Sequence, residues 1–76
     1  MKVIELFEIL PSNALVQIGL PTEYGYTYTT PSYVNNTQAF EIVMNCEVEG
    51  LYYESAAIGF SSYVIELSDT KRAING

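Results

Sequence analysis

The segment from Tyr24 to Thr30 constrains the fold most strongly. It reads Tyr-Gly-Tyr-Thr-Tyr-Thr-Thr, with a tyrosine at every second position and no good helix former. Aromatic and β-branched residues in this alternation are typical of a β-strand, and they place the tyrosines on one face. The run from Ala14 to Leu20 alternates in the same way, and Pro21-Thr22-Glu23 lies between the two runs. The sequence therefore predicts an antiparallel hairpin.

The first ten residues, Met1 to Leu10, have the pattern of an amphipathic helix. Their apolar residues recur at the spacing of one helical face, which holds Val3, Leu6, Phe7 and Leu10. Pro11 follows at once, and proline disfavours helical geometry at the residue before it. We expect the helix to end at Leu10.

The middle of the chain is ambiguous. Ser32 to Gln38 is polar and turn-like, and we expect a loop. From Ala39 to Glu49 the apolar residues alternate as in a half-buried strand. A helix in Gln38 to Asn45 explains the pattern almost as well, because Ala39, Ile42, Val43 and Cys46 form a helical stripe. Both alternatives stay open at this point.

The last third of the chain predicts two further strands and a short helical end. Leu51 to Glu54 and Ser62 to Leu67 are rich in aromatic and β-branched residues, and we expect them to pair. Ser55 to Ser61 would form the connecting loop or a bulged strand end. Ser68 to Gly76 can form a helical turn, with Ser68 or Asp69 as its cap.

These patterns predict one small α+β domain over residues 1–76. In it, an N-terminal amphipathic helix packs on a small antiparallel β-sheet of four or five strands. A chain of this length buries only about 60% of the surface that its unfolded form exposes. Because the sequence has one cysteine and no histidine, neither an internal disulfide nor a zinc site can stabilise it. We expect a homo-oligomer.

The charge balance excludes several partners. Nine carboxylates against three cations give a net charge of −6, which disfavours direct binding to nucleic acid or to an anionic membrane. Glu5 and Glu8 interrupt the apolar N-terminal stretch where an export signal would have its hydrophobic core. No run of 18 apolar residues occurs. We predict a cytoplasmic protein.

The residue inventory argues against an enzyme. A general base near neutral pH is usually histidine, and the chain has none. Cys46 lies in an apolar alternation, so we expect a buried structural thiol. Glu47 and Glu49 are best interpreted as part of a solvated acidic surface. We expect no metal and no cofactor.

Seven tyrosines are the unusual feature of the composition. The row formed by Tyr24, Tyr26 and Tyr28 can pack beneath the N-terminal helix, form a protein interface or stack on a ligand. Lys71 and Arg72 are the only adjacent cations and are the best candidates for holding an anion. These five residues are the candidate ligand-binding set.

Four segments together resemble short proteins encoded by phages and prophages of Gram-positive bacteria. In that pattern a leading helix precedes a Val-x-Ile strand, and a late strand pairs with a C-terminal one. The segments are Lys2-Val3-Ile4-Glu5-Leu6-Phe7-Glu8-Ile9-Leu10, Leu15-Val16-Gln17-Ile18, Val48-Glu49-Gly50-Leu51-Tyr52-Tyr53-Glu54 and Tyr63-Val64-Ile65-Glu66-Leu67. The chain departs from the pattern over Thr22 to Asn45 and Ser55 to Ser61, so the resemblance assigns no site residue.

The resemblance implies an accessory protein that antagonises bacterial host defence in the host cytosol. Some such proteins sequester a small nucleotide-derived immune signal in an oligomeric pocket, and we take this as the first hypothesis. The alternative is an acidic inhibitor that covers a defence protein, of the anti-CRISPR or nucleic-acid-mimic type. A third hypothesis is a small structural virion component. Under sequestration, the cations of several subunits would hold an anionic ligand whose base stacks on the tyrosines.

Overall fold

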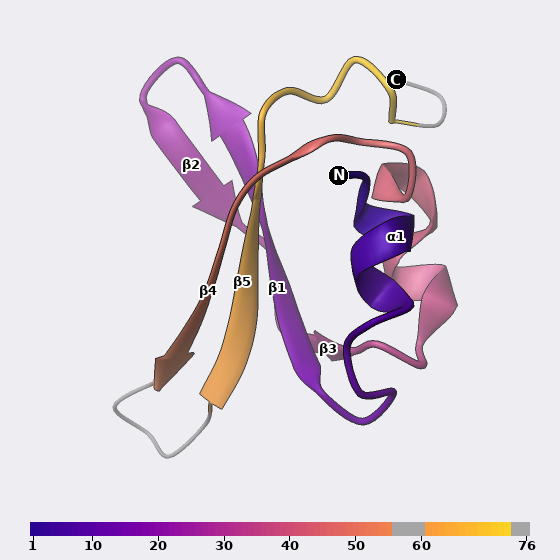
Figure 1. Cartoon of the computed structure of the whole chain (residues 1–76). Helices are drawn as coiled ribbons and strands as arrows, with labels where there is room; N and C mark the ends of the chain where they lie inside the picture. Colours follow the sequence, from indigo (N-terminus) through magenta and orange to yellow (C-terminus); the bar gives the residue numbers. More distant parts are fainter. Residues whose placement is uncertain (56–60, 74–76) are drawn as a thin grey trace.

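The chain forms an α+β fold in a computed structural model that describes residues 1–55 and 61–73. One sheet and two short helices make up the described chain (Figure 1). In order, the elements are α1 (Val3–Phe7), β1 (Leu15–Thr22), β2 (Gly25–Tyr28), β3 (Ser32–Tyr33), the 3-10 helix η1 (Thr37–Val43), β4 (Val48–Ser55) and β5 (Ser61–Leu67).

The five strands form a mixed sheet in the order β2-β1-β5-β4, and β3 also pairs with β1. The predicted β1–β2 hairpin is confirmed, with Gly19 opposite Tyr28, and β4 pairs antiparallel with β5 as expected. The prediction of a purely antiparallel sheet was wrong, because β1 and β5 run parallel, from Val16 beside Tyr63 to Gly19 beside Glu66. A parallel pair needs a long connection between its strands, which here contains η1 and β4.

The N-terminal helix is shorter than the predicted Met1 to Leu10. The Glu5 carboxylate accepts a 2.7 Å hydrogen bond from the Lys2 backbone N–H at its start. After Phe7 the chain tightens, since the Glu8 and Ile9 N–H groups donate to carbonyls three residues earlier. Such tight turns are common at helix ends, and Pro11 follows.

The ambiguous segment in the middle of the chain is helical in its first part. Phe40 and Val43 are the buried residues of η1. Positions three apart lie above one another in a 3-10 helix, so these two side chains enter the core together. The Phe40 ring meets Phe7 edge to face at 4.9 Å between centroids, which joins η1 to α1. From Ala39 to Val43 the strand alternative was therefore wrong, although Val48 and Glu49 at the end of the segment belong to β4. The alternative of a helix in Gln38 to Asn45 is confirmed as far as Val43, as a 3-10 helix.

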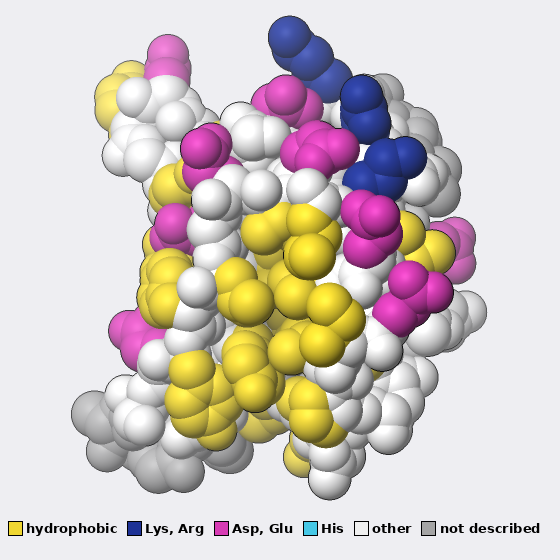
Figure 2. Space-filling model, viewed as in Figure 1, with side chains coloured by type: hydrophobic (Ala, Val, Ile, Leu, Met, Phe, Trp, Pro, Cys, Tyr) yellow, Lys and Arg dark blue, Asp and Glu magenta, His cyan; other side chains and the backbone are white. Residues whose placement is uncertain are grey.

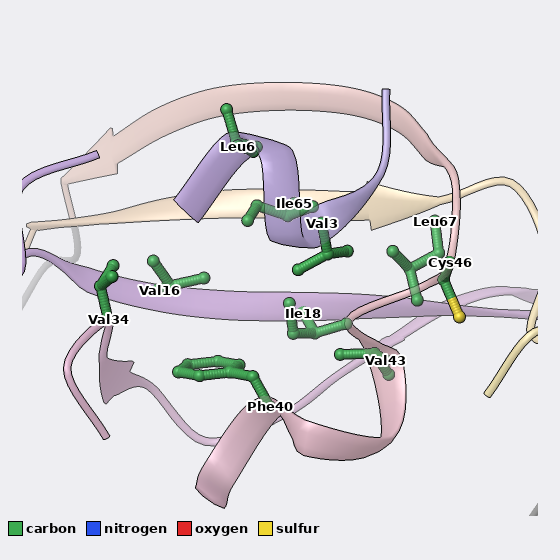
Figure 3. Close-up of a cluster of buried hydrophobic side chains, with 10 residues drawn as sticks. All are labelled: Val3, Leu6, Val16, Ile18, Val34, Phe40, Val43, Cys46, Ile65 and Leu67. Atoms are coloured by element: carbon green, nitrogen blue, oxygen red, sulfur yellow. The ribbon is translucent and has the colours of Figure 1, made fainter. Parts of the chain in front are cut away.

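The core lies between the sheet and the two helices, which cover the same face of the sheet (Figure 1). Side chains from both layers meet there (Figure 3). The buried cluster consists of Val3, Leu6, Val16, Ile18, Val34, Phe40, Val43, Cys46, Ile65 and Leu67. Cys46 is fully buried, which confirms the expected structural thiol.

The remaining predictions concern the connections. The described part of the predicted C-terminal helix forms only turns, with the Ala73 N–H donating to the Thr70 carbonyl. Ser55 and Ser61 pair as the ends of β4 and β5. The centre of the predicted connection, residues 56–60, and the predicted helix stop at Asn75-Gly76 lie outside the described residues.

Candidate functional site

The candidate site lies on the face of the sheet opposite to α1 and η1, which we call the open face. Side chains alternate between the two faces of a strand, so the neighbours of the core residues on β1 and β5 point to the open face. The strand pairing places side chains of β2 and β4 beside them. The open face contains Gln17 and Pro21 of β1, Tyr26 and Tyr28 of β2, Tyr52 and Glu54 of β4, and Ser62, Val64 and Glu66 of β5.

Glu66 joins three strands at the centre of this face. One oxygen of its carboxylate, Oε2, accepts hydrogen bonds from the Tyr28 hydroxyl at 2.5 Å and from the Tyr52 hydroxyl at 2.9 Å. The two hydroxyl oxygens are 3.4 Å apart. Hydrogen bonds to an ionised acceptor are short and comparatively strong, so this triad fixes both rings.

Gly19 gives the triad its space. It lies on β1 between Tyr28 on one side and Glu66 on the other, and it is in register with both. A Cβ atom at this position would come within 3.0 Å of Tyr28 Cε1 and of Glu66 Cγ. The missing side chain therefore lets Tyr28 reach across β1 to Glu66.

The surroundings of the open face raise the pKa of two of its tyrosines. The hydrogen bond to Glu66, followed by the one to Tyr52, raises the pKa of Tyr28 well above its usual value. Partial withdrawal from water, and after it the charges of Glu49 and Glu66, raise the pKa of Tyr26. The Tyr28 hydroxyl is therefore protonated at neutral pH and donates to Glu66.

A shallow cleft of about 340 Å³ opens beside the triad. The Ser62 hydroxyl donates to the Gln17 side-chain oxygen at 3.2 Å, and the Gln17 amide nitrogen donates to the Thr29 carbonyl at the same distance. These bonds hold the polar wall in place. The cleft is lined by Gln17, Tyr28, Tyr52, Glu54, Ser62 and Val64, so it combines aromatic rings, fixed polar groups and a carboxylate, and its lining has no cation.

The structure separates the predicted tyrosines. Tyr24 lies in the β1–β2 turn, where 92% of its surface is exposed, while Tyr26 and Tyr28 lie side by side on β2. The prediction that one strand carries all three was therefore wrong, because β1 continues to Thr22 and the turn falls at Glu23 and Tyr24, later than predicted. The row also lies on the face away from α1, which excludes packing beneath that helix.

The predicted cations lie on a different part of the chain from the tyrosines. Lys71 and Arg72 follow β5 and are exposed, and Arg72 pairs with Glu47 at 3.6 Å. The N-terminal ammonium donates to the same carboxylate at 3.0 Å and is the main cause of the lowered pKa of Glu47. Figure 2 shows the cations gathered at one end of the molecule among carboxylates. Within the described part of one chain, no contact joins them to Tyr26 or Tyr28.

Sequence reasoning missed most residues of the cleft and the triad: Gln17, Tyr52, Glu54, Ser62, Val64 and Glu66. All of them lie in segments that the sequence predicts as strands. What brings them together is the parallel pairing of β1 with β5, and no local pattern encodes which strands become neighbours. The one available signal was Gly19, since a glycine inside a strand often marks a close approach.

The acidic side chains and the cysteine are the remaining reactive groups of the described residues. No three side chains of His, Cys, Asp or Glu there gather closely enough to hold a metal ion. Burial is the main cause that raises the pKa of the Cys46 thiol, so it stays protonated and has little nucleophilic character. Among the described helices, none is both long enough and apolar enough to cross a membrane.

Comparisons with protein-family models, curated proteins and solved structures found no significant match to this chain. The resemblance to small phage proteins therefore stays a prediction, and the geometry of the open face is what bears on function.

Proposed function

We propose that this protein is a non-enzymatic binding protein and that its open face binds a basic patch on a partner protein. The observation that carries the proposal is the triad of Glu66, Tyr28 and Tyr52 beside a cleft without cations. In this proposal an arginine or lysine side chain of the partner enters the cleft and lies against the two rings. Aromatic faces attract such cations, and tyrosine is enriched in protein interfaces.

The charges near the cleft support a cationic guest over an anionic one. Glu54 lines the cleft and Glu66 lies beside it, in a chain of net charge −6. These carboxylates repel a phosphate, and they attract a basic protein surface towards the open face. This site fits the hypothesis of an acidic inhibitor that covers the basic surface of a host defence protein. The phage setting and the cytoplasmic location enter this proposal only through the resemblance.

Sequestration of a nucleotide-derived signal would need cations that a single chain does not place near the tyrosines. Tyr26 and Tyr28 offer rings on which a base can stack. The phosphate would need Lys71 and Arg72 from another copy of the chain, because in one chain Arg72 binds Glu47. An oligomer that brings these groups together would favour this second function.

The test compares an oligo-arginine peptide with a panel of cyclic nucleotides in isothermal titration calorimetry. We expect the peptide to bind and the nucleotides to give no heat. Glu66→Gln keeps a hydrogen-bond acceptor for the tyrosines but removes the charge. An exposed charge pair contributes about 0.2–1 kcal/mol, so this change should weaken peptide binding by about one and a half- to fivefold.

Glu41→Gln is the matched control, because it makes the same change of charge at an exposed site on η1. It should leave peptide affinity within experimental error of the wild type. Equal weakening by both variants would show that only net charge matters and would contradict the assigned site. Binding of a nucleotide, lost in Lys71→Glu with Arg72→Glu, would replace the proposal by sequestration.

A further inference from the structure

The outer edge of β4 is free over most of its length in the described chain. β4 pairs with β5 along one edge, and the N-terminal residues cover only the start of the other. There, the Val48 N–H donates to the Met1 carbonyl at 2.7 Å, and the backbones of Lys2 and Glu47 form an isolated antiparallel β-bridge. From Gly50 to Ser55 no strand of the described chain covers this edge. A free edge exposes backbone groups that can pair with another strand.

The same strand carries an uncovered extension of the core. Leu51 lies opposite Ile65, and the Tyr53 ring meets Tyr63 edge to face at 4.8 Å between centroids. Ile65 is completely buried, whereas 43% of Leu51 and 60% of Tyr53 are exposed. Figure 2 shows hydrophobic side chains gathered on this side of the molecule, between β4 and α1. The helices therefore cover the core as far as β5 and leave the β4 end of it open.

We propose that a second copy of the chain occupies this edge, with the two β4 strands antiparallel and a two-fold axis at Tyr52. In this register Leu51 lies opposite the partner's Tyr53, and Gly50 lies opposite the partner's Glu54. The two Tyr52 side chains face each other on the open face. Two-fold dimers are the commonest oligomers, and such pairing joins two sheets into one without a free edge at the interface.

Charge and face both argue against a shift of this register by one residue. In one direction the shift would place Glu49 opposite the partner's Glu54 at both ends of the interface, and like charges directly opposite are destabilising. It would also place Leu51 opposite Tyr52, so that the core side of one sheet would continue into the open face of the other. In the proposed register Glu54 lies opposite the partner's Gly50. The apolar side chains of Leu51 and Tyr53 lie opposite each other on the core side of the joined sheet.

This inference goes beyond the proposed function, because it concerns contact between two copies and not the partner that the open face binds. Its consequence is one continuous open face that carries two clefts, related by the axis at Tyr52. The dimer is also a definite form of the homo-oligomer that the short chain predicts.

The first test is analytical ultracentrifugation at tens of micromolar. The wild type should sediment at twice the chain mass of 8.5 kDa. Leu51→Lys with Tyr53→Lys places lysine opposite lysine twice and should raise the dissociation constant by roughly tenfold or more. Tyr24→Lys with Ile9→Lys is the matched control, since both residues are exposed apolar positions outside β4, and it should stay dimeric. A monomeric wild type, or a lysine variant of β4 that stays fully dimeric, would overturn the proposal.

Cysteine cross-linking tests the register without depending on the lysine variants folding. Residues directly opposite in antiparallel strands bring their Cβ atoms close enough for a disulfide, whereas diagonal neighbours are further apart. Under mild oxidation, Tyr52→Cys should cross-link to itself. Leu51→Cys should cross-link rapidly only when it is mixed with Tyr53→Cys. Cys46 gives little background because it is buried. Rapid self-linking of Leu51→Cys without linking of Tyr52→Cys would overturn the register.

Discussion

At the scale of single residues, the triad of Tyr28, Tyr52 and Glu66 depends on the lack of a side chain at Gly19. The hydrogen bonds from Tyr28 and Tyr52 to Glu66 span three strands, and β1 passes between Tyr28 and Glu66. Any side chain at position 19 would stand in the path of that contact. The glycine thus allows strands β2 and β5, which pair with β1 on its two sides, to join their side chains across the open face.

Gly19→Ala should therefore disturb the triad. The added methyl would meet side-chain atoms at 3.0 Å, so Tyr28 and Glu66 must move apart. Overpacking costs about 1–3 kcal/mol, and we expect about 1 kcal/mol here because the neighbouring side chains lie at the surface. Urea unfolding measures this loss.

Gly50→Ala is the control for that change. A Cβ at Gly50 would meet only Glu66 Oε1, at an ordinary contact distance of 3.6 Å. Its effect on stability should be smaller than that of Gly19→Ala. If the two alanine variants have the same unfolding midpoint and the same peptide affinity, Gly19 does not shape the site in the way described.

At the scale of elements, η1 covers the core together with α1, on the same face of the sheet (Figure 1). Phe40 is 2% exposed and packs against Phe7, whereas Ile42, two residues further along, points into solvent with 52% of its surface exposed. A short 3-10 helix of this kind has little stability of its own. Its position must come from the burial of Phe40 and Val43.

Phe40→Ala should therefore lower the free energy of unfolding by about 3–5 kcal/mol, because it removes a large buried ring and leaves a cavity. Ile42→Ala, in the same helix, should change it by no more than about 0.5 kcal/mol. Thermal or urea unfolding of the two variants checks this difference. Comparable losses in both would show that η1 does not pack as described.

The sequence predicts those elements whose partners are near in the chain. The β1–β2 hairpin could be anticipated from the alternation on both sides of a short turn, and the β4–β5 pair from its aromatic and β-branched residues. The faces of β1 were also predictable, as the burial of Val16 and Ile18 shows.

Long-range neighbours could not be predicted in this way. Periodicity fixes which face a side chain occupies but not which strand lies beside it, so the parallel β1–β5 contact was missed. In the middle segment, strand and helix periods explained nearly the same apolar positions, and the contact between Phe40 and Phe7 decided between them. Of the candidate site, only Tyr26 and Tyr28 were foreseen on a common face.

At the scale of the whole molecule, the two faces of the sheet have different roles. One face is covered by α1 and η1 and supplies most of the buried apolar surface (Figure 3). The other carries tyrosines and carboxylates and no helix in the described chain (Figure 1). The cations lie at one end, where Arg72 pairs with Glu47, away from the triad (Figure 2). This division leaves the open face acidic and aromatic, which suits a basic protein partner better than an anion.

The central claim is that the open face is the binding surface, and NMR chemical-shift mapping tests it most directly. An oligo-arginine peptide is titrated into ¹⁵N-labelled protein. We predict that the largest shifts fall on backbone amides of the open face, at Gln17, Gly19, Ser62 and Glu66, while amides of η1 stay unchanged. Largest shifts on η1, or no change at any concentration of peptide, would contradict the account.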